Sequence, residues 1–569
     1  MPMGAPATFS RVACAMLVAL ASGCVRPVGA PSRAAPPRPN IVVILADDLG
    51  FSDLGSYGGE IRTPHLDRLA RGGLRFSDFY NMARCVPTRA ALLTGVYPHQ
   101  AGLGAMTSDQ GLPGYRGGLA ENTVTIAEAL RGAGYRTGMV GKWHVSRTLA
   151  RRDPREQLDW LAHDTTFGDF SPRAQYPTAR GFDDYFGNLW GVVDYFDPFA
   201  LVNGTEPVRA VPPDYYHTDA ITDTAIAYIE RYSASDQPFF LYVAQTAPHW
   251  PLHAPAGDVA PYERTYAVGW DAIRAARYRR LLGEGIVDPA RTRLSPRVQP
   301  ERDWATNATA EWDVRAMAVH AAMVERMDRG IGRIVASLER TGRLQNTLIL
   351  FLSDNGASPE DPARYGAGFD RAGRTRDGRA VYFPVAKDSL PGPQTVHAGI
   401  GPIWANVANT PFRGAKARTY EGGIATPLVA FWPAGVRARA GSVTRQPGHV
   451  IDVMATALDL AGARYPATRG GAPVVPLAGR SLVPVLEGGT RQAHDAIYWE
   501  HEGAQAIRTG RWKLVSPTRG AAWELYDLSR DRSELTNLAH REPARVRAMS
   551  DQWAQWAART AVLPRPTRP

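Results

Sequence analysis

The 569-residue chain has only three cysteines, at positions 14, 24 and 85. Two of them lie in the first 24 residues, so the rest of the chain keeps a single cysteine, Cys85. One cysteine can build neither an internal disulfide framework nor a thiolate zinc site, which excludes both beyond residue 24. Long apolar runs are also missing. After the N-terminus, no segment has the length that a membrane-spanning helix needs.

Lysine is almost as scarce as cysteine. Of the 65 basic residues only four are lysines, namely Lys142, Lys387, Lys416 and Lys513, and the other 61 are arginines. A lysine kept in such a chain is expected where a compact ammonium group is needed, because arginine is a wider planar fork that stays protonated. Lys142 and Lys416 fall in polar strings described below. They are therefore candidates for chemistry.

The net charge of +10 comes from basic residues that are spread along the chain and form no patch. This distribution argues against nucleic acid as a partner. A mildly positive surface suits a small anionic substrate instead. Hydrophobic residues make up 44% of the chain, which is enough for one large soluble enzyme with a small appended domain.

Residues 1–24 have the features of an export signal. Arg11 precedes an apolar run over residues 12–21, which is too short to span a bilayer but fits the hydrophobic part of a secretory signal. Ser22-Gly23-Cys24 follows and resembles a bacterial lipobox, in which Cys24 would be lipidated and begin the mature protein. An ordinary cleaved signal is the alternative. Residues 25–39 are rich in Pro, Ala and Arg and predict a flexible linker. We expect a bacterial protein that is exported and either periplasmic or anchored by a lipid.

Four short apolar runs predict buried parallel strands, and each ends in polar residues. They are Asn40–Ala46 before Asp47 and Asp48, Tyr135–Val140 before Lys142 and His144, Phe239–Val243 before His249, and Thr347–Leu352 before Asp354 and Asn355. Helical patterns lie between them, for example over Val124–Arg131 and Met317–Leu338. Ligands bind at the carboxyl ends of the strands in α/β sheets, so four polar clusters in this position predict a binding site.

Asp47, Asp48, Asp354 and Asn355 supply three carboxylates and an amide. Oxygen ligands of this kind suit a hard divalent cation. Without a cation, neighbouring buried acids would repel each other and one would tend to stay protonated. The alternative is that these residues only cap the helices that follow.

Cys85 begins the string Cys85-Val86-Pro87-Thr88-Arg89, and a small apolar run up to Thr94 follows. Pro87 suits the first turn of a helix, so Cys85 is expected at a helix N-terminus, where backbone N–H groups favour anions. Taken alone, a cysteine there could be a buried small residue, a redox thiol or half of a disulfide. The whole string resembles the maturation signature of the type I sulfatases, with Thr88 where that family usually has Ser or Ala. The resemblance implies that a formylglycine-generating or sulfatase-maturing enzyme oxidises Cys85 to Cα-formylglycine.

Further strings occur in sulfatases in the same order along the chain. They are Asp47-Asp48, Gly141–His144, Ala247–Pro251, Ser353–Gly356 and Asn409–Lys416 before Glu421–Ile424. The resemblance covers residues 40–538 and is closest to bacterial arylsulfatases, with a long insert between Asn355 and Lys416. It implies an alkaline-phosphatase-like α/β fold, a mixed and mostly parallel sheet flanked by helices, over residues 40–485. A smaller C-terminal α+β domain would cover residues 486–569, where alternating patterns over 506–514 and 523–528 predict an antiparallel sheet.

The resemblance also implies a role for each site residue. Hydrated formylglycine has two hydroxyls, of which one attacks sulfur and the other later expels sulfate. The cation held by the three aspartates and Asn355 would polarise the attacking hydroxyl and a sulfate oxygen, with calcium favoured and magnesium the alternative. The remaining residues would hold the hydrate (Arg89 and Lys142), act as the base of the second step (His144), or bind sulfate and protonate the leaving oxygen (His249 and Lys416).

The sequence thus predicts a sulfuric ester hydrolase of arylsulfatase type that acts on a small sulfate ester. One alternative is a phosphodiesterase or phosphonate monoester hydrolase on the same scaffold. Another is a non-catalytic anion-binding protein with an unmodified Cys85. The natural ester and the oligomeric state are left open, because the pocket walls are expected in loops such as 110–118, 153–181 and 357–403. We interpret His253 as an exposed loop histidine, with a place in the wall of the substrate pocket as the alternative. We interpret Trp250 as a packing residue and assign no role to His397.

Overall fold

A mixed β-sheet forms the centre of the structure, a computed structural model that describes residues 38–163 and 169–566. Within these residues the sheet has eleven strands in the order β10-β2-β9-β8-β1-β7-β3-β4-β5-β6, and β11 also pairs with β2. The strands are β1 (Asn40–Ala46), β2 (Leu74–Tyr80), β3 (Arg136–Gly141), β4 (Asp184–Asn188), β5 (Leu201–Asn203), β6 (Glu206–Pro207), β7 (Phe239–Ala244), β8 (Thr347–Ser353), β9 (Ala425–Phe431), β10 (Ser442–Thr444) and β11 (Gly448–His449). The predicted export signal, with Cys14 and Cys24, and most of the predicted linker lie outside the described residues.

The middle of the sheet is parallel. Strands β8, β1, β7, β3 and β4 run in one direction, and β9 pairs antiparallel with both β8 and β2. All seven residues of β1 are buried, as expected for a strand with neighbours on both sides and helices on both faces. The predicted mixed, mostly parallel sheet is confirmed.

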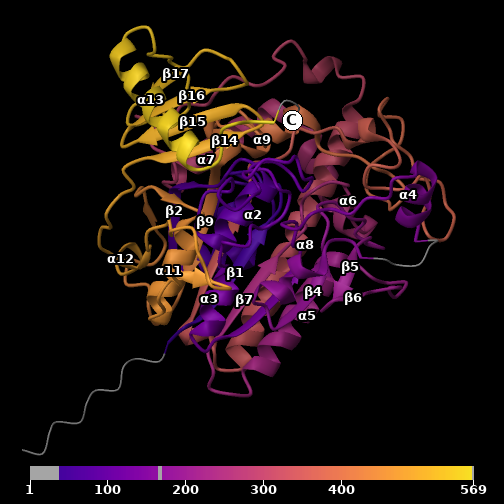
Figure 1. Cartoon of the computed structure of the whole chain (residues 1–569). Coiled ribbons are helices and arrows are strands. Elements are labelled where there is room, and N and C mark those ends of the chain that lie inside the picture. Colours follow the sequence, from indigo (N-terminus) through magenta and orange to yellow (C-terminus); the bar gives the residue numbers. More distant parts are fainter. Residues whose placement is uncertain (1–37, 164–168, 567–569) are drawn as a thin grey trace, which may run out of the picture. The chain divides into compact units, whose positions relative to one another are not determined.

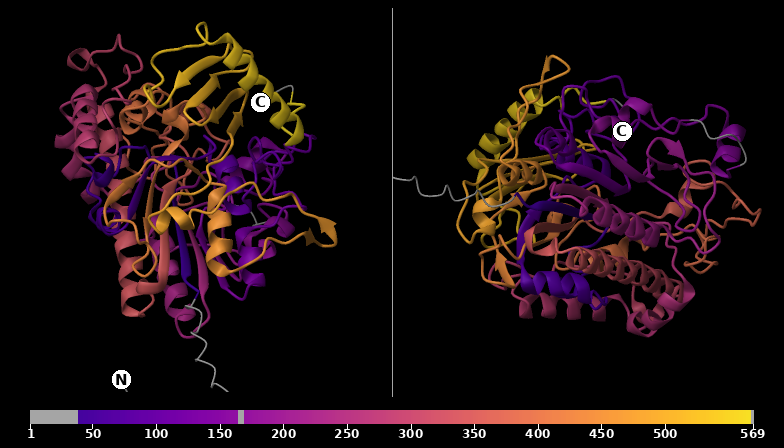
Figure 2. Two further views of the ribbon diagram at one scale, coloured as in Figure 1. Left: turned by 90° about the vertical axis from the view of Figure 1, so that its left-hand side faces the viewer. Right: turned by 90° about the horizontal axis from the view of Figure 1, so that it is seen from below.

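Helices cover both faces of this sheet (Figures 1 and 2). On one face α8 packs against α1, α5 and α6, and on the other α2, α3 and α11 pack together. The helices are α1 (Pro64–Gly72), α2 (Cys85–Thr94), α3 (Ile126–Gly132), α4 (Pro154–Leu161), α5 (His217–Tyr232), α6 (Ala256–Tyr266), α7 (Trp270–Gly283), α8 (Ala310–Arg340), α9 (Gly401–Ala408), α10 (Glu421–Ile424), α11 (Asp452–Ala461), α12 (Val483–Leu486) and α13 (Pro543–Arg559). No helix among the described residues combines the length and the apolar character needed to cross a bilayer.

The C-terminal part contains a second sheet, drawn in yellow in Figure 1. Its four antiparallel strands are β14 (Ile497–His501), β15 (Ala504–Thr509), β16 (Trp512–Ser516) and β17 (Glu524–Asp527), and α13 contacts β15 and β16. The predicted antiparallel sheet is therefore confirmed. Residues from Arg38 onward group into one compact unit, and the domain boundary at residue 485 stays a prediction. A two-stranded ribbon, β12 (Thr468–Arg469) with β13 (Ala472–Pro473), lies before it in the chain.

The ends of two predicted helices differ from the observed ones. The helix expected from Val124 starts at Ile126, because Thr125 caps it and forms a capping box with Glu128. The helix expected over Met317–Leu338 extends to Ala310–Arg340, since its apolar stripe continues beyond the predicted range. Strand β1 has the predicted bounds.

Candidate active site

The register of the parallel strands brings the four predicted polar strings to one edge of the sheet. Leu45 of β1 pairs with Ala244 of β7 and with Leu352 of β8, and Gly141 of β3 also pairs with Ala244. The strands thus end at the same level, and the residues that follow them emerge together. Asp47, Asp48, Lys142, His144, His249, Asp354 and Asn355 all lie there and are all buried.

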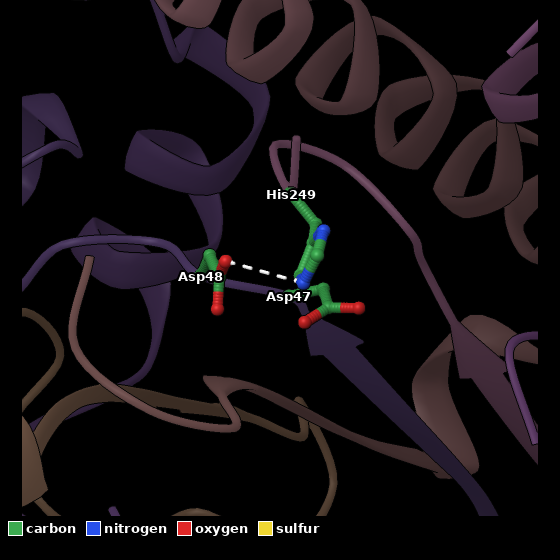
Figure 3. A group of neighbouring side chains, drawn as sticks. All are labelled: Asp47, Asp48 and His249. Carbon is green, nitrogen blue, oxygen red and sulfur yellow. Dashed lines mark ion pairs between the residues drawn. The ribbon is translucent and has the colours of Figure 1, made fainter. Parts of the chain in front are cut away.

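The predicted metal ligands are in contact with one another. Asn355 Nδ2 donates to Asp48 Oδ1 at 2.6 Å, and the backbone N–H of Asp48 donates to Asp354 Oδ1 at 3.3 Å. Asp48 has a positive φ of 66°, which turns the chain sharply after β1. One ligand atom from each of Asp47, Asp48 and His249 lies within 4.8 Å of the others, and Figure 3 shows the imidazole of His249 beside the two aspartates, with its ion pair to Asp48 dashed.

Two oxygens in this cluster support a cation site. Asp47 Oδ1 and Asn355 Oδ1 are buried and have no hydrogen-bond partner among the described residues. A buried polar atom without a partner is costly, and a hard cation would satisfy both oxygens. Burial, together with the charge of Asp47, raises the pKa of Asp354 to about 7. The donor set, three carboxylates and an amide oxygen, therefore fits a divalent cation.

Arg89 and Lys142 bind these acids. Arg89 donates through Nη2 and Nε to Asp354 Oδ2 at 2.8 and 3.1 Å, and through Nη1 to the carbonyl of Lys142 at 3.0 Å. The ammonium group of Lys142 forms a short hydrogen bond with Asp47. Burial raises the pKa of Asp47, but the positive charges of Lys142 and Arg89 outweigh it and leave that pKa lowered.

Cys85 is the first residue of α2 and is buried, as the sequence predicted. The hydroxyl of Thr88 accepts a hydrogen bond from the backbone N–H of Met82, which fixes the turn that enters the helix. Burial raises the pKa of the Cys85 thiol, while the nearby charges of Lys142 and Lys416 oppose this shift. The thiol therefore lies within reach of the charges of both lysines that the sequence singled out.

Lys416 and His249 form a directly hydrogen-bonded pair. Lys416 Nζ lies 2.8 Å from Asp48 Oδ1 and 3.0 Å from His249 Nε2. His249 Nδ1 lies 2.5 Å from the carbonyl oxygen of Trp250, so Nδ1 carries the proton and Nε2 accepts from the ammonium group. Burial, helped by the charge of Lys416, holds the pKa of His249 well below its usual value. Burial alone would lower the pKa of Lys416, but Asp48 and Glu360 raise it.

His144 stands apart from the hydrogen-bonded pairs. It adopts a positive φ of 54°, and its Nδ1 is buried without a hydrogen-bond partner among the described residues. Gly191 lies against its imidazole, because a Cβ at that position would come within 2.2 Å of the ring. Burial and the charge of Lys142 hold the pKa of His144 well below its usual value, so the ring is neutral and able to accept a proton.

Sequence reasoning missed two charged residues of the site, Arg84 and Glu360. Arg84 precedes Cys85 and pairs with Glu360 at 2.9 Å, and Glu360 also lies 3.3 Å from Lys416 Nζ. The position of Arg84 next to Cys85 could have marked it. Glu360 belongs to the insert and carries no local signal, so only the folded chain shows its place.

The expectation for His253 was wrong. This histidine is fully buried, with Nδ1 3.5 Å from Asp194 Oδ1, because the segment after β7 turns inward and is covered by the insert. Trp250 packs as expected, but its indole N–H also donates to Glu360 at 3.0 Å. His397, to which no role was assigned, is buried with Nε2 3.6 Å from Asp370.

The chain is similar in sequence to known sulfatases. The sequence model of the sulfatase family matches residues 39–463, and that of the C-terminal part of N-sulphoglucosamine sulphohydrolase matches residues 415–555. An uncharacterized sulfatase of Schizosaccharomyces pombe is 32% identical over 573 residues, which cover 93% of this chain and 95% of the relative. The arylsulfatase of Klebsiella aerogenes is 32% identical over 461 residues, which cover 78% and 91%.

Solved structures show the same fold. A sulfatase of Pseudoalteromonas sp. superposes with a TM-score of 0.58 at 22% identity and covers 93% of this chain and 92% of its own. The phosphonate monoester hydrolase of Agrobacterium radiobacter gives 0.52 at 20% identity, with 92% and 96% covered. At these identities the likeness is one of fold alone.

Proposed function

The chain belongs to the sulfatase family, whose members are sulfuric ester hydrolases, and from this premise we propose that it is an arylsulfatase-type enzyme that uses a formylglycine made from Cys85 and one divalent cation. The observation that carries the proposal is the place of Cys85. It lies at the first turn of α2, among the charges of Lys142, Lys416, Asp47 and Asp354. A structural cysteine would need no such surroundings.

Asp47, Asp48, Asp354 and Asn355 would hold the cation, with Ca²⁺ favoured by the all-oxygen donor set and Mg²⁺ the alternative. When bound, the cation would neutralise charge on the sulfate, and the formylglycine hydrate would supply the nucleophilic hydroxyl. Arg89 donates to Asp354 and to the Lys142 carbonyl, so it would orient the metal ligands as well as the residue at position 85. The short contact between Lys142 and Asp47 serves the same purpose.

Lys416 and His249 would place a proton at the leaving oxygen. The ammonium proton of Lys416 already points at His249 Nε2, and Glu360 and Asp48 keep Lys416 charged. The leaving alcohol needs this proton because an unprotonated alkoxide or phenoxide is a poorer leaving group than the neutral alcohol or phenol. His144 is neutral, and its Nδ1 has no hydrogen-bond partner in the described part of the chain, so it would accept the proton released when sulfate departs.

The N-terminal expectations remain part of the proposal. We propose that residues 1–24 direct export, that Cys24 carries the lipid, and that the enzyme is periplasmic or membrane-anchored in a bacterium. Replacing Cys24 by Ala should then abolish incorporation of labelled fatty acid without changing sulfatase activity. Fatty acid incorporation that persists in this variant would contradict lipidation at Cys24.

The decisive experiment combines peptide mass analysis with kinetics. Active protein should carry an aldehyde on the peptide containing residue 85, trapped by a hydrazide, and its activity should scale with the modified fraction. Full activity with a wholly unmodified Cys85 thiol would contradict the proposal. Turnover of sulfate monoesters, phosphate monoesters and phosphate diesters by one preparation separates the sulfatase from a phosphodiesterase or phosphonate monoester hydrolase. An absence of all turnover together with an unmodified Cys85 would favour a non-catalytic binding protein.

A further inference from the structure

Large apolar side chains are exposed mainly in one short segment of the insert. Among the described residues, six large hydrophobic side chains are exposed, and four of these lie between residues 365 and 385. They are Tyr365, Phe369, Tyr382 and Val385. An exposed cluster of this kind in a folded protein usually marks a site for an apolar partner.

Two of these rings, Phe369 and Tyr365, are connected through Trp250 to His249, which belongs to the proposed proton-donating pair. Phe369 and Tyr365 stack with ring centroids 4.9 Å apart, and Tyr365 lies 5.8 Å from Trp250. Trp250 in turn lies 4.7 Å from the imidazole of His249. We call Phe369, Tyr365 and Trp250 the ring path. The exposed fraction of the side chain falls from 61% at Phe369 through 44% at Tyr365 to 6% at Trp250. The path therefore leads from solvent to the catalytic cluster.

The inner end of the ring path is fixed in place. The indole N–H of Trp250 donates to Glu360 Oε2 at 3.0 Å, and the same oxygen lies 3.3 Å from Lys416 Nζ. The position of the indole is thus tied to the ammonium group that would protonate the leaving oxygen. Trp250 is almost fully covered, so Tyr365 and Phe369 offer the ring faces that a ligand can reach.

The charges around the ring path are already neutralised. Each arginine between residues 360 and 380 faces a carboxylate: Arg364 faces Asp361, Arg371 faces Asp194, Arg374 faces Asp159, Arg376 faces Asp197 and Arg379 faces Asp377. The insert's lysine, Lys387, faces Asp313. A second sulfate or a carboxylate on the alcohol would find no free cation among the described residues from 360 to 390. A polyanionic sugar is therefore a poor match for this surface.

We propose that the ring path binds the alcohol part of the ester, and that the preferred substrate is the monosulfate of a flat phenol with two or more fused rings. The proposal rests on the proposed function, because the alcohol extends along the ring path only if its leaving oxygen lies at His249 and Lys416. A phenol with one ring would reach no further than the inner end of the path. A phenol with several rings would also stack on Tyr365 and Phe369, which a flat apolar ring does favourably.

The test compares 4-nitrophenyl sulfate, 1-pyrenyl sulfate and glucosamine 6-sulfate on four variants. Tyr365→Ala and Phe369→Ala should each raise KM for 1-pyrenyl sulfate about 3- to 10-fold, the range of one lost ring contact, with kcat unchanged. The same variants should change KM much less when the substrate is the single-ring nitrophenyl ester. Tyr365→Phe keeps the ring and should restore wild-type KM. Tyr382→Ala, which removes an exposed ring of the same segment outside the path, is the matched control and should be silent.

A preference of the wild-type enzyme for glucosamine 6-sulfate, or equal effects of the two alanine variants on all three esters, would overturn the proposal. Binding of free 1-hydroxypyrene to the Cys85→Ala protein, followed by equilibrium dialysis, tests the ring path without turnover. Binding of 1-hydroxypyrene should weaken in the double variants that also carry Tyr365→Ala or Phe369→Ala. Undiminished binding there would overturn the ring path. An enzyme that hydrolyses no sulfate ester despite a modified residue 85 would instead overturn the proposed function.

Discussion

Two buried charge clusters have similar compositions and different surroundings. The strand-end cluster contains Asp47, Asp48, Asp354, Glu360, Arg89, Lys142 and Lys416. The junction cluster contains Asp78, Glu421, Glu534, Arg508, Lys513 and Arg532 and joins α10 to the C-terminal sheet. Both are built from acids and bases removed from water, and both contain lysine.

The junction cluster is closed. Both oxygens of Glu421 are bound, by Lys513 at 2.9 Å and Arg532 at 3.0 Å. Glu534 meets Lys513 at 2.8 Å and the backbone N–H of Glu421 at 2.7 Å. Asp78 faces Arg532 at 3.2 Å and Arg291 at 2.8 Å. Glu534 Oε1 has no hydrogen-bond partner among the described residues, but it faces the ammonium group of Lys513 in that ion pair. Each carboxylate oxygen of these three residues therefore faces a cation or an N–H donor.

The strand-end cluster is open. Its cations face acids as well, yet Asp47 Oδ1 and Asn355 Oδ1 keep no partner among the described residues. The charges of the junction cluster bind one another and stabilise the fold. The charges of the strand-end cluster leave two oxygens that a ligand, such as a cation, can bind. Burial of a lysine does not by itself indicate catalysis, because Lys513 is as buried as Lys142.

The largest effect is expected from Asp354→Ala. Removing this carboxylate takes away a cation ligand and leaves Arg89 without its main partner, so bound metal and turnover should fall together, turnover on the order of 10³-fold. Metal content by elemental analysis and 4-nitrophenyl sulfate kinetics check this. Asp354→Asn, which keeps an oxygen, should lose less. Metal-free protein with unchanged turnover would show that the open cluster holds no catalytic cation.

Lys416→Arg should lower kcat by about 10²–10³-fold, the usual cost of one displaced donor at a reacting group. Arginine keeps the charge, but its wider fork cannot stay within reach of Asp48 and His249 as the ammonium group does. Thermal unfolding of the same variant should change little relative to the kinetic loss. Wild-type kcat would remove Lys416 from the proposed proton path.

Lys513→Arg applies the same substitution to the closed cluster. The larger group must fit among Glu421 and Glu534 in a fully packed site, which should lower the free energy of unfolding by about 1–3 kcal/mol. Because no substrate contact is involved, kcat of the folded protein should stay within about twofold. Urea unfolding and kinetics at saturating substrate measure the two quantities. A fall in kcat like that of Lys416→Arg would erase the distinction between the clusters.

The junction cluster should also show in the pH dependence of stability. Burial raises the pKa of Glu534 from 4.5 to about 7 in the folded protein. Below pH 4.5 the residue is protonated in both states, and as pH rises toward 7 the unfolded state ionises first, so stability is lost. Relative to Glu534→Gln, the wild-type protein should lose about 2 kcal/mol between pH 5.5 and pH 7. Parallel stability curves for the two proteins would contradict the raised pKa.

The smallest effect is expected from Lys387→Arg. Lys387 faces Asp313 and lies 4.3 Å above the ring of Trp312, and arginine can make both interactions. Stability should stay within about 0.5 kcal/mol and kcat should be unchanged. Differential scanning calorimetry and aryl sulfate kinetics provide the check. A kinetic loss equal to that of Lys416→Arg would mean that the scarcity of lysine carries no functional information.

The sequence by itself determined much of the fold and most of the cluster. The apolar runs of β1, β3, β7 and β8 fixed the buried strands, because a strand covered on both faces must be apolar throughout. The polar residues after these runs then had to meet at one edge, since parallel strands end on the same side. Pro87 and the helix-forming run after it predicted the position of Cys85 and Arg89 in the first turns of a helix.

Only the tertiary structure decided which charges are left open and which are closed. Glu360 reaches Lys416 from the insert, and Lys513 meets Glu421 across 92 residues of chain. His253, expected at the surface, is buried because the insert folds over it. The ring path from Phe369 to His249 likewise joins segments with no shared local pattern. Contacts of this kind depend on how loops pack against one another, and that packing leaves no periodic trace in the sequence.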